Sequence, residues 1–344
     1  MARAGFLGRR LGRLAPVPPS REALARLVNA ALEAQGAEPA ALRPRDPGGR
    51  PGGLLLLPPL PTVLVPDLHA RAPFLEAVLG WTPPGSRGAL RELLASGEAQ
   101  LVCLGDLFHS EAGAARRRWA EALREYLALW SSSRAMDEEM GLSLAVASLV
   151  LEAKAAYPKV FHCLKGNHDN LTDEEGRGDH SFYKFAAEGE MVASWFAARY
   201  GRELLEAYRR FELGLPLLAL GDRFAASHAE PAFAVGREEL VEYRLRPEIA
   251  EALTWTANGA AEPGSVELSL ARLFAGNGAG EGGPGGEAAA GARWFGGHRP
   301  VEGRYALRAG GRFVQFHDPE TWRVAYLLPG RDPDPERDIV DIRG

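Results

Sequence analysis

The stretch VFHCLKGNHDN, residues 160 to 170, joins a short apolar run to an unusual group of polar residues. Val160 to Leu164 has the composition of a buried β-strand. Lys165 and Gly166 end this run, and Asn167, His168 and Asp169 follow in succession. Gly-Asn and His-Asp pairs are ordinary turn chemistry, because glycine tolerates positive φ and asparagine or aspartate can bond the neighbouring backbone. The meaning of this turn therefore depends on the rest of the chain.

Similar apolar runs recur on both sides of this stretch, with helical patterns between them. TVLV (62–65) and LVCL (101–104) precede it, and LPLLAL (215–220) and RFAASH (223–228) follow it. Four more strand-like runs lie near the C-terminus: ARWFGG, GRYALRA, GRFVQF and TWRVAYLL. Helical periodicity predicts helices over 21–35 behind Ser20 as N-cap, around Trp119, over 143–158 and over about 186–212. This alternation predicts an α/β fold with helices on the faces of a sheet.

The composition excludes several classes of protein. The 344 residues are 46% hydrophobic and 25% charged, which is normal for a globular protein. The net charge of −5 argues against nucleic acid as a partner. No apolar run approaches the roughly 18 residues of a membrane span, so no membrane partner is expected. Cys103 and Cys163 are interpreted as reduced core thiols, and the predicted location is the cytoplasm. A transit peptide in the arginine-rich opening is the alternative.

The chain is expected to consist of a central domain with two flanking segments. Residues 1–58 are predicted to form an N-terminal extension with one amphipathic helix and a Pro/Gly-rich linker. Residues 59–330 are predicted to form the main domain, with a helical insert at about 110–140 and a glycine-rich loop at 275–292. Residues 331–344 are expected to form a C-terminal tail.

Polar residues gather where the predicted strands end. Asp67-Leu68-His69 follows the first strand, Gly105-Asp106 the second and Gly166 to Asp169 the third. Later strands are followed by His228 and His298. In open α/β sheets, ligands bind outside the carboxyl ends of the strands, so these side chains are expected to face one crevice.

This set of side chains suits two-metal hydrolysis. Imidazole and carboxylate together favour Zn, Mn or Fe over Mg or Ca. The i, i+2 spacing of Asp67 and His69 puts both side chains on one side of an extended segment. Asp106 could bridge two ions that share a water, bringing it towards hydroxide at neutral pH. Asn167 could offer its amide oxygen to the second ion, which leaves His168 as a proton donor beside the substrate.

In their order along the chain, these motifs resemble those of the calcineurin-like metallophosphoesterases. The pattern is Asp-x-His, Gly-Asp, Gly-Asn-His-Asp, a lone histidine and Gly-His, and SLAVASLVLEAKAAYPKVFHCLKGNHD is similar to the phosphoprotein (serine/threonine) phosphatase branch. The likeness covers roughly residues 60–330 and implies a two-sheet β-sandwich flanked by helices. It also implies two metal ions. The first ion would be bound by Asp67, His69 and Asp106, and the second by Asp106, Asn167, His228 and His298, with His168 as the acid for the leaving group.

The chain departs from the phosphatase branch directly after Asp106. That branch continues to an aspartate that orients the catalytic histidine and an arginine that binds phosphate, but GDLFHSE places His109 and Ser110 there. The substrate-binding residues are therefore left unassigned. His109 is either a partner of His168 or a surface residue, and at least two of Arg116, Arg117 and Arg118 are expected on a solvated helix face. The helical insert is expected to cap the crevice and restrict substrates.

Residues outside the set have simpler expected roles. Asp169 is predicted to hold the turn, and His162, His180 and His317 are predicted to be structural or exposed. The predicted function is hydrolysis of phosphate esters, of a small molecule or a phosphoprotein, by a hydroxide that two metal ions share. A serine/threonine protein phosphatase-like enzyme is one form of this prediction. One alternative is a nucleotide or dinucleoside polyphosphate hydrolase or a phosphodiesterase. Another is a catalytically silent module of the same fold, which acts only by binding.

Overall fold

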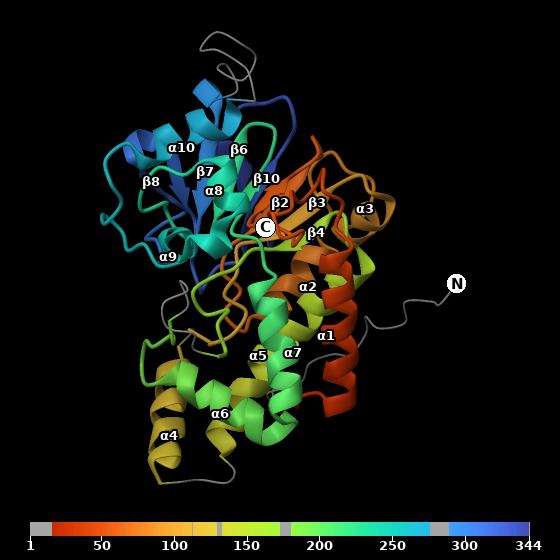
Figure 1. Ribbon diagram of the computed structural model, residues 1–344, viewed down its shortest axis with the longest axis vertical. Coiled ribbons are helices and arrows are strands. Elements are labelled where there is room, and N and C mark those ends of the chain that lie inside the picture. The colour runs from red at the N-terminus through yellow and green to blue at the C-terminus, as the bar shows by residue number, and fades with distance from the viewer. Residues whose placement is uncertain (1–15, 112, 129–132, 173–179, 276–288, 344) are drawn as a thin grey trace.

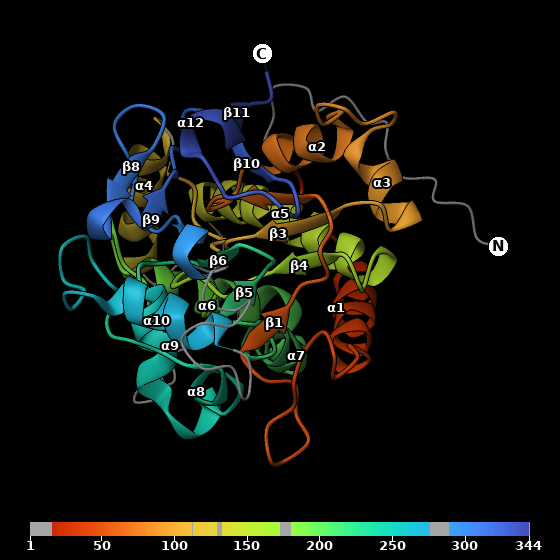
Figure 2. The ribbon, with the colours of Figure 1, turned by 90° about the horizontal axis from the view of Figure 1, so that it is seen from above.

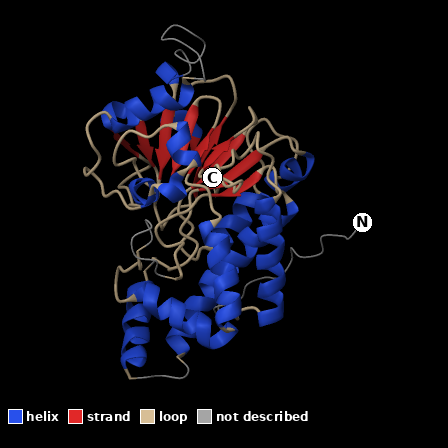
Figure 3. Cartoon of the chain, viewed as in Figure 1, coloured by secondary structure: helices blue, strands red, loops and turns tan. Residues whose placement is uncertain are grey.

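Two β-sheets pack face to face in this computed structural model, and helices cover their outer faces (Figures 1 and 3). The structure describes residues 16–111, 113–128, 133–172, 180–275 and 289–343. One sheet has the strand order β1-β5-β6-β7-β9-β8, and the other has the order β11-β10-β2-β3-β4. The predicted two-sheet α/β sandwich flanked by helices is confirmed.

The strands are short. They are β1 (Leu54–Leu56), β2 (Thr62–Val65), β3 (Gln100–Cys103), β4 (Phe161–Cys163), β5 (Leu218–Leu220), β6 (Phe224–Ser227), β7 (Arg293–Gly296), β8 (Ala306–Arg308), β9 (Phe313–Gln315), β10 (Arg323–Leu327) and β11 (Ile339–Asp341).

Most of the long helices lie below the sheets in Figure 1, and α8 to α10 lie beside the first sheet. The helices are α1 (Arg21–Gly36), α2 (Ala72–Gly80), α3 (Leu90–Ser96), α4 (Ala115–Leu127), α5 (Arg134–Ala156), α6 (Glu188–Tyr200), α7 (Arg202–Leu213), α8 (Arg237–Val241), α9 (Pro247–Thr254), α10 (Ser265–Phe274) and α12 (Pro335–Asp338), with 3-10 turns η1 (Tyr243–Leu245) and η2 (Ala309–Gly311).

Alternate residues of the central strands pack into two different cores. Leu64 of β2 and Val102 of β3 face the other sheet and share a cluster with Phe295 of β7. Their neighbours Val63 and Leu101 belong to the cluster that packs against the helices. This follows from the period of two in a strand, which sends successive side chains to opposite faces. Both faces of the second sheet are therefore buried. Figure 2 shows the two sheets from above, with β3 and β4 of the second sheet near β5 and β6 of the first.

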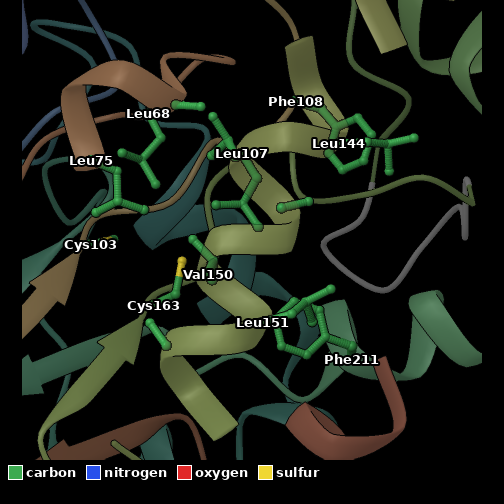
Figure 4. Close-up of a cluster of buried hydrophobic side chains, with 14 of the residues drawn as sticks. Leu68, Leu75, Cys103, Leu107, Phe108, Leu144, Val150, Leu151, Cys163 and Phe211 are labelled. Atoms are coloured by element: carbon green, nitrogen blue, oxygen red, sulfur yellow. The ribbon is translucent and has the colours of Figure 1, made fainter. Parts of the chain in front are cut away.

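The helix-side core is built around α5, which packs against β4 and α1 (Figure 4). Cys163 lies near Val150 of α5 in this core, and Leu151 lies near Phe211 of α7. Cys103 and Cys163 are both free and buried. The prediction of two reduced core thiols is thus confirmed.

Every strand and helix predicted from the sequence is present, with two changes. The helical region at about 186–212 is divided into α6 and α7 at Gly201, whose φ of +84° is outside the helical range. The segment interpreted as an irregular linker contains β1. Helix α1 begins as predicted, because the Ala23 N–H donates to Ser20 Oγ at 3.2 Å.

Both segments flanking the predicted main domain supply an edge strand to a sheet. β1 pairs in parallel with β5, and β11 pairs antiparallel with β10. The boundaries near residues 58 and 330 remain a prediction. Most of the glycine-rich loop and the arginine-rich opening lie outside the described residues. Within the described ranges, no helix has the length and apolarity needed to cross a bilayer.

A buried group of charges joins the N-terminal segment to α5. Glu38 Oε2 lies 3.0 Å from Arg43 Nη1, and Glu38 Oε1 contacts Lys154 Nζ. The three side chains are between 0% and 6% exposed. Burial raises the pKa of Glu38, but the adjoining His162 and the charges of Lys154 and Arg43 outweigh this and lower it to about 2. Glu38 thus compensates two buried cations at neutral pH.

Glu38→Gln is expected to lower the free energy of unfolding by about 3 to 5 kcal/mol, because it leaves both cations without their carboxylate. The pKa of Glu38 is lower in the folded state, so its contribution is present above about pH 4.5 and is lost as the pH falls towards about 2. Urea unfolding from pH 7 to pH 3 measures both effects. The exposed Glu33→Gln on α1 is the control, and equal urea midpoints for the two variants would contradict the assignment.

Candidate metal centre

The sheet topology brings the polar strand ends together. β2, β3 and β4 are parallel neighbours, so their carboxyl ends lie at one edge of the second sheet. β6, β7 and β9 are likewise parallel neighbours in the first sheet. The residues that follow these strands lie within reach of one another. They are Asp67, His69, Asp106, Asn167, His168, His228 and His298, all at most 8% exposed.

Two histidines present a free ring nitrogen to the centre. His69 Nδ1 lies 2.9 Å from the His109 carbonyl oxygen, and His228 Nδ1 lies 2.9 Å from the Leu104 carbonyl oxygen. A carbonyl only accepts, so both Nδ1 atoms carry the proton and both Nε2 atoms offer a lone pair. This arrangement, with one ring nitrogen anchored and the other free, is the one seen in metal-binding histidines.

Asp106 lies between the two histidines. Its Oδ2 is 3.3 Å from His69 Nε2 and 3.4 Å from His228 Nε2. Its Oδ1 accepts a hydrogen bond of 2.8 Å from the His168 backbone N–H, which fixes the carboxylate. Asp106 Oδ2 therefore faces one histidine from each sheet, His69 after β2 and His228 after β6.

The second set is a convergence of polar side-chain atoms. His228 Nε2 lies 2.9 Å from Asn167 Oδ1 and 3.2 Å from His298 Nδ1, and Asn167 Oδ1 lies 3.0 Å from His298 Nδ1. The Asp67 Oδ1 atom is buried without a hydrogen-bond partner among the described residues. His228 Nε2 and Asn167 Oδ1 both carry lone pairs, and a cation between them would offset their repulsion. Carboxylate, imidazole and amide oxygen fit Mn, Fe or Zn.

The backbone around the centre is held in an unusual conformation. Six described non-glycine residues have positive φ, and His69, Asp106, His109 and His298 are four of them. Such conformations cost about 1 to 3 kcal/mol each and persist where the surroundings over-determine them. A Cβ at Gly166 would overlap the Asp106 carboxylate, so only glycine fits there.

Asp169 holds the two turns together, as predicted. Its Oδ2 accepts from the N–H groups of Asp106 and Gly166, both at 2.8 Å, and its Oδ1 accepts from Leu107 N–H at 2.9 Å. The turn after β4 is thus tied to the turn after β3. Asp169 is fully buried, and its oxygens are occupied by the backbone.

Burial dominates the protonation of the centre. It lowers the pKa of His69 to about 3 and that of His298 to about 2, so both rings are uncharged at neutral pH. Burial, together with Asp67 and Asp169, raises the pKa of Asp106. Burial raises the pKa of Asp67 as well, but His317 and His228 outweigh it and lower that pKa. Uncharged imidazole is the form that binds a metal ion.

His168 lies on the helical side of the centre among other rings. Its ring centroid is 4.6 Å from that of Phe182 in a stacked arrangement, 4.8 Å from that of His109 and 5.0 Å from that of His69. Its Nδ1 has no hydrogen-bond partner in the described part of the chain. Burial, with His109 and His69 as neighbours, lowers the pKa of His168 well below its usual value.

His109 is buried beside His168, which excludes the alternative of a surface residue. Its Nε2 lies 3.3 Å from Glu188 Oε1, and its ring stacks on Trp119 of the helical insert with centroids 5.2 Å apart. Glu188 also accepts from the Lys184 N–H at 2.9 Å. The insert therefore supports the ring group around His168, and its role as a cap over substrates remains a prediction.

The residues where the phosphatase branch carries its arginine are engaged in structural bonds. Ser110 N–H and Oγ–H both donate to Glu139 at 2.7 Å, and Arg118 donates to Glu139 at 2.7 Å and to Ser110 Oγ at 2.8 Å. Arg116 and Arg117 are exposed on α4. The prediction that at least two of these arginines lie on a solvated face is confirmed.

Two residues at the centre were not predicted from the sequence. His317 was predicted to be structural or exposed, but it is fully buried with its Nε2 3.9 Å from Asp67 Oδ2. Glu111 Oε1 lies 3.2 Å from His69 Nε2. The signal for His317 was its place two residues after β9, which matches the place of His298 after β7. His162 is buried against Glu38, and His180 is 47% exposed, as expected.

Comparison with known proteins supports the fold. No family model matches this chain, and no curated protein matches it. A serine/threonine phosphatase from Saccharomyces cerevisiae, described as similar to human phosphatase PP5, matches with a TM-score of 0.55 and 12% identity over 94% of this chain and 89% of that chain. The chain therefore has the fold expected from the resemblance to the calcineurin-like metallophosphoesterases.

Two further solved structures match less closely. A cold-active protein-tyrosine phosphatase of a psychrophile, Shewanella sp., has a TM-score of 0.37 and 13% identity over 86% of this chain and 79% of that chain. A putative diadenosine tetraphosphatase has a TM-score of 0.37 and 14% identity over 82% of this chain and all of that chain.

Asp169→Asn is expected to lower the free energy of unfolding by about 2 to 4 kcal/mol, because an amide cannot accept all three buried N–H bonds and each unmet bond costs about 1 to 3 kcal/mol. Urea unfolding at pH 7 measures the change. Asp222→Asn is a matched control, since Asp222 is exposed and accepts from one described backbone group, Gly330 N–H. Equal urea midpoints for Asp169→Asn and the parent would show that the turns hold without this carboxylate.

Proposed function

We propose that this chain is a binuclear metal-dependent phosphoesterase that hydrolyses phosphate esters. The observation that carries the proposal is the position of Asp106, whose Oδ2 lies 3.3 Å and 3.4 Å from the Nε2 atoms of His69 and His228. In this proposal Asp67, His69 and Asp106 bind the first ion. Asp106, Asn167, His228 and His298 bind the second. Mn, Fe and Zn are the metals that this donor set suits.

The ligand residues also orient one another. The backbone N–H of His298 donates to Asp67 Oδ2 at 2.8 Å, so a residue of the first site positions a residue of the second. Arg71 donates to the Asp67 carbonyl oxygen at 2.8 Å and to the carbonyls of residues 318, 319 and 321. A pair of bound ions would supply an acidified water and neutralise phosphoryl charge. The role of the protein is to hold the ligand atoms rigidly around the positions of the two ions.

His168 is proposed as the group that protonates the leaving oxygen. Its ring lies beside His69 without entering the group of acceptors around Asn167. Because burial lowers its pKa, the ring is uncharged at neutral pH, and a bound phosphate ester supplies the negative charge that favours its protonated form. The stacked Phe182 and the neighbouring His109 fix the ring while leaving it free to move a proton.

Asp106→Asn is expected to lower the bound metal per chain and the hydrolysis of an aryl phosphate together, because both ions would lose a charged ligand. The chelator-treated protein is reloaded separately with Mn, Fe or Zn, and elemental analysis gives the metal content. Asp222→Asn serves as the control. Equal metal content in Asp106→Asn and the parent would contradict the bridging role of Asp106. Full metal binding by the parent without turnover of mono- or diesters would favour a silent binding module.

His168→Ala is expected to slow alkyl phosphates by on the order of 10² to 10⁴-fold, because their leaving alkoxides need a proton, and to slow nitrophenyl phosphate far less. Metal content should be unchanged. Asn167→Ala should instead weaken the second ion and slow both substrates equally. Rates over leaving groups of graded pKa are the measurement. If His168→Ala lowers the rates for all leaving groups by the same factor, or loses a metal ion, then another group is the acid.

A further inference from the structure

Glu111 and His317 form a buried pair against the His69 side of the centre. Glu111 Oε2 lies 3.1 Å from His317 Nε2, and Glu111 Oε1 lies 3.2 Å from His69 Nε2. The Glu111 side chain is 5% exposed and the His317 side chain is fully buried. A carboxylate placed so far from solvent needs a positive partner, because its burial otherwise costs several kcal/mol.

These atoms have the spacing of one coordination shell. Two donors about 2.1 Å from the same ion lie about 3 Å apart at right angles and about 4 Å apart when opposite. Asp67 Oδ2 lies 3.9 Å from His69 Nε2 and 3.9 Å from His317 Nε2. Asp67, His69 and His317 each offer an atom within 4.8 Å of the others. The Glu111 distances fall in the same range.

We propose that Glu111 and His317 are two additional ligands of the first ion, completing a shell with Asp67, His69 and Asp106. This inference rests on the proposed two-metal function. It gives the first ion three carboxylates, whereas the second ion shares one carboxylate and otherwise has an amide and two imidazoles. Because Coulombic attraction to a cation grows with the ligand charge, the first ion is held more tightly and the second is the one that exchanges.

Lys184 separates this role from that of a simple ion pair. Its Nζ contacts Glu111 Oε1, and its side chain is 33% exposed. The ammonium group is partly exposed and contacts the same Glu111 oxygen that lies 3.2 Å from His69 Nε2. If Glu111 served only to pair with Lys184, removal of either partner would have the same effect. If Glu111 binds metal, removal of Lys184 leaves the ligand in place.

The experiment is a calorimetric titration of the chelator-stripped full chain with Mn²⁺ alone. The parent is expected to bind two ions, one more tightly than the other. Glu111→Gln and His317→Asn should each lower the affinity for the tighter ion by at least about tenfold. Substitution of residues that only support the ligands already costs about this much affinity, so loss of a direct ligand should cost no less. Lys184→Met should keep that affinity. Glu138→Gln and His180→Asn, which remove a partly exposed carboxylate and an exposed imidazole, are the matched controls.

Each contrary result has a distinct meaning. Parent affinity for both ions in Glu111→Gln or in His317→Asn overturns the five-ligand shell while leaving the two-metal function intact. An equal loss in Lys184→Met and Glu111→Gln shows an ion pair and also overturns it. A parent chain that binds no Mn²⁺ overturns the proposed function together with this inference. Circular dichroism of each variant confirms that the fold is retained, and Glu111→Asp, which keeps the charge, should recover part of the affinity.

Discussion

The carboxylate of Asp106 is the point on which the two sheets converge. It follows β3, the middle strand of three parallel neighbours, and its Oδ2 faces one histidine that follows β2 and another that follows β6. Its own N–H donates to Asp169, and its Oδ1 accepts from His168 N–H. With a φ of +55°, the residue has little freedom to turn elsewhere. Both candidate ligand sets are positioned relative to this one group.

Burial makes this arrangement expensive without a cation. Asp67, Asp106 and Asp169 are all buried within a few residues of the strand ends, and Asp67 and Asp169 both raise the pKa of Asp106. His69 and His298 are uncharged at neutral pH, so these two rings do not compensate for the carboxylates. Bound cations would offset the repulsion and join acceptors that otherwise oppose one another. The proposed metal centre is therefore also a proposed source of stability.

The two sides of the centre are built differently. The sheet side provides anchored donor atoms, because strand ends are fixed by the ladders and by the close approach of glycine. The helical side provides aromatic rings around His168 and a supporting carboxylate from Glu188 at the start of α6. The rigid sheet side suits metal binding, which depends on precise distances. The helical side leaves the His168 imidazole outside the cluster around Asn167, where it is available for proton transfer.

The central strands, the polar turns after them and their meeting at one edge follow from the sequence. These features are local, since an apolar run and the residue that follows it are adjacent in the chain. Parallel pairing then brings the ends together by a general rule of α/β sheets. For this reason the sequence could predict that Asp67, His69, Asp106, Asn167, His168, His228 and His298 lie close together, and the structure places them so.

Tertiary structure alone decided what lies around that group. His317 reaches the centre because β9 pairs with β7 as well as with β8, the strand that precedes it in the chain. No local sequence pattern predicts the pairing with β7. Glu111 arrives through a loop whose course depends on the buried Ser110–Glu139 bonds. β1 and β11 are three-residue strands that exist only through their partners. Long-range pairing selects these contacts, because their stabilisation comes from residues distant in the chain.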